Sequence, residues 1–213
     1  MIAHTDPGPD DRLPIGGSAL QCRLAEAAVE LFGTRGAPAT SVRDITALCG
    51  LSPGALYNHF ASKEELLYIL VRDIHLQVDA RMAATLITAG PDPAVQLAAT
   101  VRLLASRTAR NKKRARLANR EFTALSGSRR QEITALRLQI RDRLTGILLA
   151  GAKAGTFHLA GGDDLSAATL ASATITAMCV HISERTMENY QFSFEDLEDR
   201  YAEMALRIAG ARD

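Results

Sequence analysis

One stretch, TSVRDITALCGLSPGALYNHF over residues 40–60, constrains the fold more than any other part of the chain. Thr40 or Ser41 can cap a short helix by accepting a hydrogen bond from a free main-chain N–H group, and Asp44 completes a capping box. Gly50 can adopt the positive φ with which such a helix commonly ends. The sequence therefore predicts a short helix followed by a sharp turn.

A second short helix is predicted directly after this turn. Ser52 can cap it, and Pro53 fits its first position, where a missing N–H group costs nothing. Two short helices joined by a tight turn that contains glycine are typical of a helix-turn-helix motif, whose second helix enters the major groove of DNA. We therefore place a helix-turn-helix motif at residues 41–60.

The residues of the second helix suit contact with a duplex. Gly54 and Ala55 are small enough to let the backbone approach closely, whereas Tyr57, Asn58 and His59 carry groups that can donate to a phosphate or read a base edge. The DNA-binding residues predicted from the sequence are Thr40, Ser41, Arg43, Ser52, Pro53, Gly54, Ala55, Tyr57, Asn58, His59 and Lys63.

This region resembles the tetracycline-repressor (TetR) family of bacterial transcriptional regulators. The resemblance covers residues 20–70 and depends on the pattern G-x-LYNHF-x-SKEEL, which a generic helix-turn-helix would not require. It implies an all-helical, dimeric protein that binds a palindromic operator and releases it when a small molecule enters the C-terminal domain. In the family, the lysine that matches Lys63 contacts the DNA backbone. The matching residues are Ala27, Leu31, Phe32, Gly36, Thr40, Ser41, Ile45, Gly50, Ser52, Gly54, Leu56, Tyr57, His59, Phe60, Lys63, Glu64 and Leu66.

The apolar periodicity of the chain predicts an all-α fold of the same kind. Residues 17–64 are expected to form a three-helix DNA-binding domain, whose first helix ends at Gly33 and Gly36. The sequence Ser62-Lys63-Glu64-Glu65 is a capping box that opens a helix of about 25 residues, which would extend about 38 Å towards a separate body. Residues 65–213 are expected to bind the effector and form the dimer, and residues 1–16 to form a disordered arm.

Charge and cysteine content limit the class of protein. The 25 basic and 24 acidic residues leave a net charge of +1, so we expect contact with DNA to be localised and selective. Cys22, Cys49 and Cys179 are far apart, which indicates a reduced cytosol. The N-terminus has no apolar signal region, and no stretch approaches about 18 uncharged apolar residues, so we expect a cytoplasmic protein that does not enter a membrane.

A basic cluster lies between residues 93 and 120, which contain no acidic residue. Three interpretations remain open. The cations can form a solvated face that the acidic C-terminal residues compensate, they can hold the phosphates of an anionic effector, or they can flank DNA. The cluster consists of Arg102, Arg107, Arg110, Lys112, Lys113, Arg114, Arg116 and Arg120.

The remaining helices are expected to enclose an effector cavity and to form a homodimer. Small residues between 163 and 187 permit close helix packing, and the two C-terminal helices of each subunit would build a four-helix interface, as in the family. The run ANREFTALSGSRRQEITALRLQI is also similar to TetR-like regulators of lipid and sterol catabolism whose effectors are CoA thioesters. The predicted cavity residues are Met82, Leu86, Leu103, Leu104, Phe122, Leu144, Leu148, Met178 and His181.

The sequence contains no recognisable catalytic or metal-binding motif. The five histidines never occur as HxxxH or HExxH, and GxSxG is absent, so we expect no enzyme, no metal and no cofactor. His181 can be a core histidine with satisfied hydrogen bonds or a polar group that faces the effector.

We interpret the chain as a cytoplasmic transcriptional repressor that a small molecule, for instance an acyl-CoA, releases from a palindromic operator. One alternative is a TetR-like regulator of efflux or stress genes that senses a lipophilic compound. Another is a helical dimerisation module that does not bind DNA.

Overall fold

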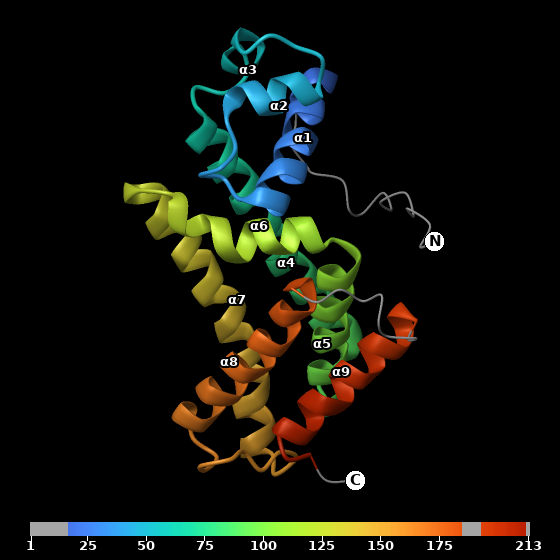
Figure 1. Ribbon diagram of the computed structural model, residues 1–213. Coiled ribbons are helices and arrows are strands. Elements are labelled where there is room, and N and C mark those ends of the chain that lie inside the picture. Colours follow the sequence, from blue (N-terminus) through green and yellow to red (C-terminus); the bar gives the residue numbers. More distant parts are fainter. Residues whose placement is uncertain (1–16, 185–192, 212–213) are drawn as a thin grey trace.

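The computed structural model describes residues 17–184 and 193–211. All regular elements in these ranges are helices, which confirms the predicted all-α fold. Residues 1–16, where a disordered arm was predicted, lie outside the described part of the chain. A head is formed by α1 (Ala19–Arg35), α2 (Val42–Leu48) and α3 (Gly54–Tyr57). The head lies at one end of an elongated molecule, opposite the C-terminus (Figure 1).

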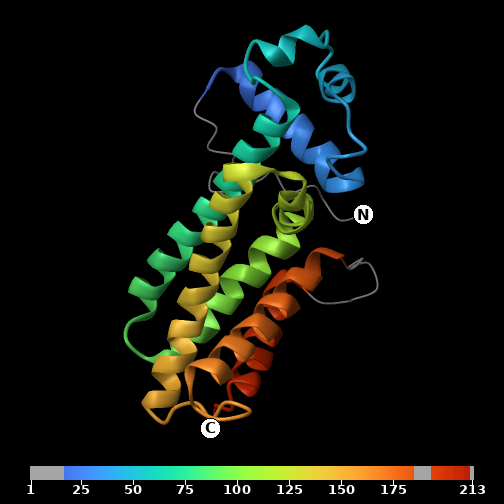
Figure 2. The same cartoon turned by 90° about the vertical axis from the view of Figure 1, so that its left-hand side faces the viewer.

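The body lies below this head and consists of longer helices. Its long axis follows α4 and α7, which pack side by side (Figure 2). Helix α5 packs against both of these helices, α8 packs against α7 and α5, and α9 packs against α5. The body elements are α4 (Lys63–Ala89), α5 (Pro93–Arg110), α6 (Lys112–Arg120), the 3-10 turn η2 (Glu121–Ala124), α7 (Gly127–Lys153), α8 (Leu165–His181), the 3-10 turn η3 (Ile182–Glu184) and α9 (Phe194–Ile208).

The first helix is longer than its glycines suggested. It continues through Gly33 and ends at Gly36, which has a φ of 88°. The prediction that Gly33 helps to end the helix is therefore wrong. Gly33 instead marks a close crossing of α1 and α6, because a Cβ atom at this position would lie 2.5 Å from the main-chain oxygen of Lys113.

The caps of the two helix-turn-helix elements differ from each other. Ser41 caps α2, and Asp44 accepts a hydrogen bond from the Ser41 N–H in return, so the predicted capping box is confirmed. The α3 helix has no side-chain cap, and the predicted role of Ser52 is therefore wrong. The main-chain oxygen of Ser52 instead accepts a hydrogen bond from the N–H group of Ala55, so the first turn of α3 is stabilised by backbone contacts.

The long helix α4 belongs to the cores of both the head and the body. Leu66 and Leu70 are buried in the head core, whereas Met82 is buried further along the helix. The head core also includes Leu117 and Ile133 from α6 and α7. Hydrophobic packing therefore crosses the predicted domain boundary after residue 64, and the division into two functional domains stays a prediction.

The helix α8 is more apolar than the sequence analysis allowed. Together with η3 it forms a stretch, Leu165–Glu184, that is long and apolar enough to cross a membrane by length and composition alone. The expectation that no such stretch exists is therefore wrong. Within the fold α8 packs against α7, and Ala168 and Ile175 belong to the body core. A core helix has the same composition, and the uncovered part of α8 is considered below.

The basic cluster is divided among several partners. Most of its surface cations form ion pairs with acidic residues, as expected if the cluster is a solvated face whose charge is compensated. Two further arginines, Arg107 and Arg114, line an internal pocket. The ion pairs join Arg102 to Asp199, Arg110 to Glu198, Arg120 to Glu184, and Lys113 to Glu30 of α1.

Candidate nucleic-acid interface and effector pocket

The tip of the head is formed by α2 and α3, on the side remote from the body (Figure 1). Leu56 and Phe60 are buried and fix α3 to the head core. Tyr57 lies next to these anchors with 56% of its surface exposed, and Asn58 is exposed as well. Leu56 and Phe60 thus fix a short turn to the head core, and the hydrogen-bonding side chains of Tyr57 and Asn58 on this turn are exposed to solvent.

Most of the predicted DNA-binding residues lie on this surface. Ser41, Arg43, Ser52, Pro53, Gly54, Tyr57 and Asn58 are exposed, and Ala55, His59 and Lys63 are half-buried. Thr40 differs from them, because it is only 1% exposed and its hydroxyl donates to the main-chain oxygen of Gly36 at 2.8 Å. The hydroxyl of Thr40 is thus used within the head, and a contact of Thr40 with DNA stays a prediction.

Lys63 connects α4 to the segment that precedes α2. Its Nζ atom donates to the main-chain oxygens of Ala37 and Thr40, both at 2.8 Å. These bonds leave one ammonium proton of three for another acceptor. The geometry gives Lys63 a structural role in the head, and its contact with a phosphate stays a prediction.

Few cations of the head are available to a phosphate backbone. Arg35 forms an ion pair with Asp44 at 2.8 Å, and Arg23 donates to the main-chain oxygen of Cys49. Arg43 is exposed and, within the described residues, forms no ion pair. The head therefore presents mainly neutral hydrogen-bonding groups, which suits selective contact better than general attraction to nucleic acid.

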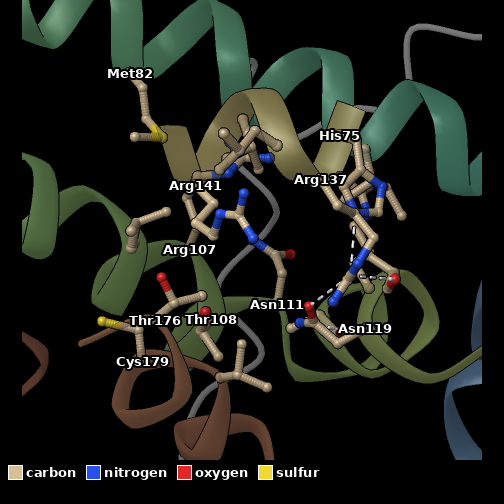
Figure 3. Close-up of a pocket in the computed structure, with 18 of the residues that line it drawn as sticks. His75, Met82, Arg107, Thr108, Asn111, Asn119, Arg137, Arg141, Thr176 and Cys179 are labelled. Carbon is tan, nitrogen blue, oxygen red and sulfur yellow. Dashed lines mark hydrogen bonds between the residues drawn. The ribbon is translucent and has the colours of Figure 1, made fainter. Parts of the chain in front are cut away.

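The body contains a cavity of about 140 Å³ between α4, α5, α6, α7 and α8. At one end lie Met82 and Cys179, and at the other lie His75, Arg137 and Asn119 (Figure 3). Leu104 and Leu144 belong to the apolar part of the wall. Burial raises the pKa of Cys179 to about 12, so this thiol stays neutral and is part of the apolar lining.

The polar part of the wall is strongly biased towards positive charge. Of the described residues that line the cavity, four are arginines and none is acidic. Arg107 comes from α5, Arg114 from α6, and Arg137 and Arg141 from α7. An apolar cavity with an excess of guanidinium groups suits a ligand with an apolar part and an anionic part.

His75 lies at the cationic end of the cavity. Burial, together with the nearby charge of Arg137, lowers the pKa of His75 to about 4. The Nδ1 atom of His75 lies 2.7 Å from the main-chain oxygen of Val71. Because a carbonyl can only accept, Nδ1 carries the proton, and the neutral ring presents Nε2 to the cavity as an acceptor.

Arg137 projects from α7 between α4 and α6. Its Nη1 atom lies 3.4 Å from Nε2 of His75 and donates to Asn119 Oδ1 and to the main-chain oxygen of Ala118, both at 3.3 Å. Its guanidinium carbon also lies 4.3 Å from the centre of the Phe122 ring. Burial lowers the pKa of Arg137 from its usual value.

The predicted cavity residues are only partly correct. Met82, Leu104 and Leu144 line the cavity. Leu86, Leu148 and Met178 pack into the body core, Leu103 is half-buried away from the cavity wall, and Phe122 packs against the head core. His181 is exposed on α8, so both predicted environments for this histidine are wrong. These six residues are apolar or amphipathic, as a cavity lining would be, but none of them lies on the side of its helix that faces the cavity.

The sequence analysis missed the polar lining. A usable signal was the helical spacing from the correctly predicted residues, because residues seven apart share a face of a helix. His75 precedes Met82 by seven positions, and Arg137 precedes Leu144 by seven. The interpretation that the basic cluster holds an anionic effector agrees in part, since Arg107 and Arg114 line the cavity.

Comparison with known proteins identifies the family. Residues 24–68 match the family described as bacterial regulatory proteins of the tetR family, and residues 90–209 match the tetracyclin repressor-like C-terminal domain. The second match covers more than half of the 213 residues. The chain belongs to the TetR family.

Individual relatives agree with this assignment. The TetR protein is 32% identical over 163 residues to the HTH-type transcriptional repressor KstR2 of Rhodococcus jostii, covering 72% of this chain and 74% of that one. It is 31% identical to a tetR-family regulatory protein from Rhodococcus RHA1, with a TM-score of 0.83 over 92% of this chain and all of that chain. It shares the fold of AibR, crystallised with isovaleryl coenzyme A and operator DNA, at 20% identity and a TM-score of 0.74, covering 91% of this chain and all of that chain.

Membership of the TetR family decides between the broad classes of function. Proteins of this family are DNA-binding transcription regulators and not enzymes, and the matched residues 24–68 include α2 and α3 at the tip of the head. The helical dimerisation module that does not bind DNA is therefore excluded as the protein's function. Within the described residues no group of three or more potential metal-ligating side chains occurs.

Proposed function

We propose that this TetR protein is a repressor that binds a palindromic operator through α3 and leaves it when a small molecule occupies the body cavity. The exposed turn Gly54–Tyr57, fixed from below by Leu56 and Phe60, carries the proposal. Tyr57 and Asn58 are the side chains that we assign to base or phosphate contacts, with Ser41 and Arg43 beside them on α2. The cytoplasm is the compartment that this function requires.

We further propose that the protein acts as a homodimer through α8 and α9. The outer face of α8 carries Leu170, Ala173, Ala177 and His181, all of them exposed in one subunit. Leu170 is 65% exposed. An exposed leucine followed at helical spacing by further exposed apolar residues forms an apolar surface that is unusual for a face in contact with water. A twofold dimer covers this face and places two copies of α3 about one turn of DNA, roughly 34 Å, apart.

The effector that fits the cavity best is an acid with an apolar chain, free or as a CoA thioester. The four arginines and the apolar wall support this choice, and AibR, which shares the fold, was crystallised with a CoA thioester. A neutral lipophilic compound, as in a regulator of efflux or stress genes, is the second candidate. It would use the apolar wall, formed by Met82, Leu104 and Leu144, but not the arginines.

The assignment of α3 is tested by replacing Tyr57. Duplexes that the wild-type protein selects from a random pool are used to compare wild type with Tyr57→Ala by fluorescence anisotropy. We expect the variant to bind at least about fivefold more weakly, because a lost base or phosphate contact costs about 1–3 kcal/mol. Ile87→Ala is the matched control, since Ile87 is 83% exposed on α4 of the body.

Two outcomes would contradict the proposed function. Equal affinity of Tyr57→Ala and wild type for the selected duplex would remove α3 from the interface. Failure of the wild-type protein to enrich any sequence, or binding that is insensitive to salt, would contradict operator recognition as such.

A further inference from the structure

The helices α4 and α7 are joined by polar contacts along their length. At three points along the two helices a carboxylate, Glu64, Glu132 or Asp79, balances the charge of a partner or accepts a hydrogen bond from the other helix or its N-cap. Contacts at these points join Ser126 to Glu64 at 2.9 Å, Arg72 to Glu132 at 2.7 Å, and Arg143 to Asp79 at 2.5 Å.

A fourth contact, between His75 and Arg137, contains no carboxylate. It lies between the second and third of these contacts, where the two helices border the cavity. The guanidinium Nη1 points to the neutral Nε2 of His75 over 3.4 Å, which is a long hydrogen bond. At this point α4 and α7 are therefore held together more weakly than at the other three.

Arg137 has only neutral partners in the part of the chain that the structure describes. These are His75, the main-chain oxygen of Ala118, the amide oxygen of Asn119 and the ring of Phe122. A guanidinium that loses water without gaining a counter-ion is costly to bury. Arg137 lines the cavity, so an anion that enters can supply the missing charge.

We propose that Arg137 is the residue that recognises the acidic group of the effector. This inference rests on the proposed function and specifies it. The fork of N–H donors can bind a carboxylate or a phosphate oxygen pair side by side, while the apolar chain of the ligand lies towards Met82 and Leu144. Arg107 and Arg114 add positive potential around the same space, whereas the charge of Arg141 is balanced by Asp142 at 3.1 Å.

Occupancy of Arg137 changes the contact with α4. The contacts of Arg137 with His75, Ala118 and Asn119 all start from Nη1, which carries two protons, so an anion that accepts one of these protons competes with the three neutral acceptors. His75 belongs to α4, and Phe122, on which Arg137 stacks, packs against the head core. The ligand's charge is thereby linked to the helix that carries the head.

The test compares an acid with its uncharged analogue. Isothermal titration calorimetry measures binding of octanoate, octanoyl-CoA and octanol to wild type, Arg137→Gln and Arg130→Gln. Arg130→Gln is the matched control, because Arg130 is an exposed arginine on the same helix and does not line the cavity. Wild type is expected to bind at least one of the two anionic ligands ten or more times more tightly than octanol.

For Arg137→Gln we expect the anionic ligand and octanol to bind with about equal affinity. The affinity for octanol should be the same as in wild type. Arg130→Gln should retain the full preference. If the affinity for octanoate depends on Arg137, the group bound at this site is a carboxylate. If only the affinity for octanoyl-CoA depends on Arg137, the bound group is a phosphate of the thioester. The unchanged affinity for octanol shows in the same experiment that the variant's cavity is intact.

The proposal is overturned if Arg137→Gln keeps every preference for an anion that wild type shows, if wild type binds octanol as tightly as both anions, or if neither anion binds. Selection of duplexes by the wild-type protein separates this failure from failure of the proposed function. A protein that selects an operator but shows no dependence on Arg137 remains a repressor with a different effector site.

Discussion

His75 shows how a single buried residue can make this fold sensitive to pH. Its ring is held neutral, with Nδ1 bonded to Val71 and Nε2 facing Arg137. The sequence did not indicate this, since a histidine among Ile74 and Val78 on a long helix can equally face solvent. Burial depends on how α6 and α7 pack across α4, which periodicity within α4 does not specify.

Stability is expected to fall as His75 becomes protonated in the unfolded state. Because burial lowers the pKa from 6.5 to about 4, the folded form binds a proton less readily than the unfolded form. The contribution of His75 to the free energy of unfolding, about 3 kcal/mol in total, is therefore fully present above pH 6.5 and is lost as the pH falls towards 4. Urea unfolding of wild type and His75→Leu between these pH values measures the effect.

The difference between the two proteins isolates the histidine, because other titrating groups are common to both. His75→Leu should show a shallower loss of unfolding free energy over this pH range. Parallel curves for the two proteins would mean that the imidazole is not buried as described.

At the scale of elements, the crossing of α1 and α6 fixes the head on the body. Gly33 permits it, because no side chain separates α1 from the backbone of Lys113. The sequence indicated most helices correctly, including the capping box at Ser41. Of the capping box predicted at Ser62, only one half forms, because Ser62 accepts from the N–H of Glu65 but the Glu65 carboxylate accepts from Ala61. The sequence misplaced the end of α1, because a glycine at a close contact between helices cannot be distinguished from a glycine that ends a helix when only local sequence is considered.

Gly33→Ala is expected to destabilise the protein even though alanine favours helix formation. The added Cβ meets main-chain atoms of Lys113 at 2.5 Å and 2.8 Å, and such overpacking costs about 1–3 kcal/mol. Gly146→Ala is the control, because Gly146 lies inside α7 with no atom within 4 Å of an added Cβ. There we expect a gain of about 0.5–1 kcal/mol from helix propensity alone.

Thermal unfolding of the three proteins by circular dichroism distinguishes these effects. The melting temperature should fall for Gly33→Ala and rise for Gly146→Ala. A rise for both variants would show that α1 and α6 are not in close contact.

For the whole molecule, the uncovered face of α8 is the feature that one subunit cannot explain. Leu165 and Leu170 are 62% and 65% exposed, and Ala173 and Ala177 continue the same face. The resemblance to the family implied dimerisation, and the small residues along this helix indicated close helix packing. The sequence did not show that His181 belongs to the outer face, since the helix is apolar on nearly all sides.

Ala177→Glu is expected to separate the dimer, because it places a charge in the centre of the proposed apolar contact. Light scattering coupled to size exclusion should show a dimer for wild type and a monomer for the variant at micromolar concentration. Ala150→Glu, which introduces the same charge at an exposed position on α7, should remain dimeric. A dimeric Ala177→Glu variant would move the interface away from α8.

The most direct test of the whole account is the linkage between the DNA site and the cavity. Fluorescence anisotropy with a selected duplex measures DNA affinity with and without the acid that binds through Arg137. We predict at least a fivefold loss of DNA affinity at saturating acid, and an equal loss of acid affinity at saturating duplex, as thermodynamic linkage requires. DNA affinity that is unchanged by a bound acid would contradict the account.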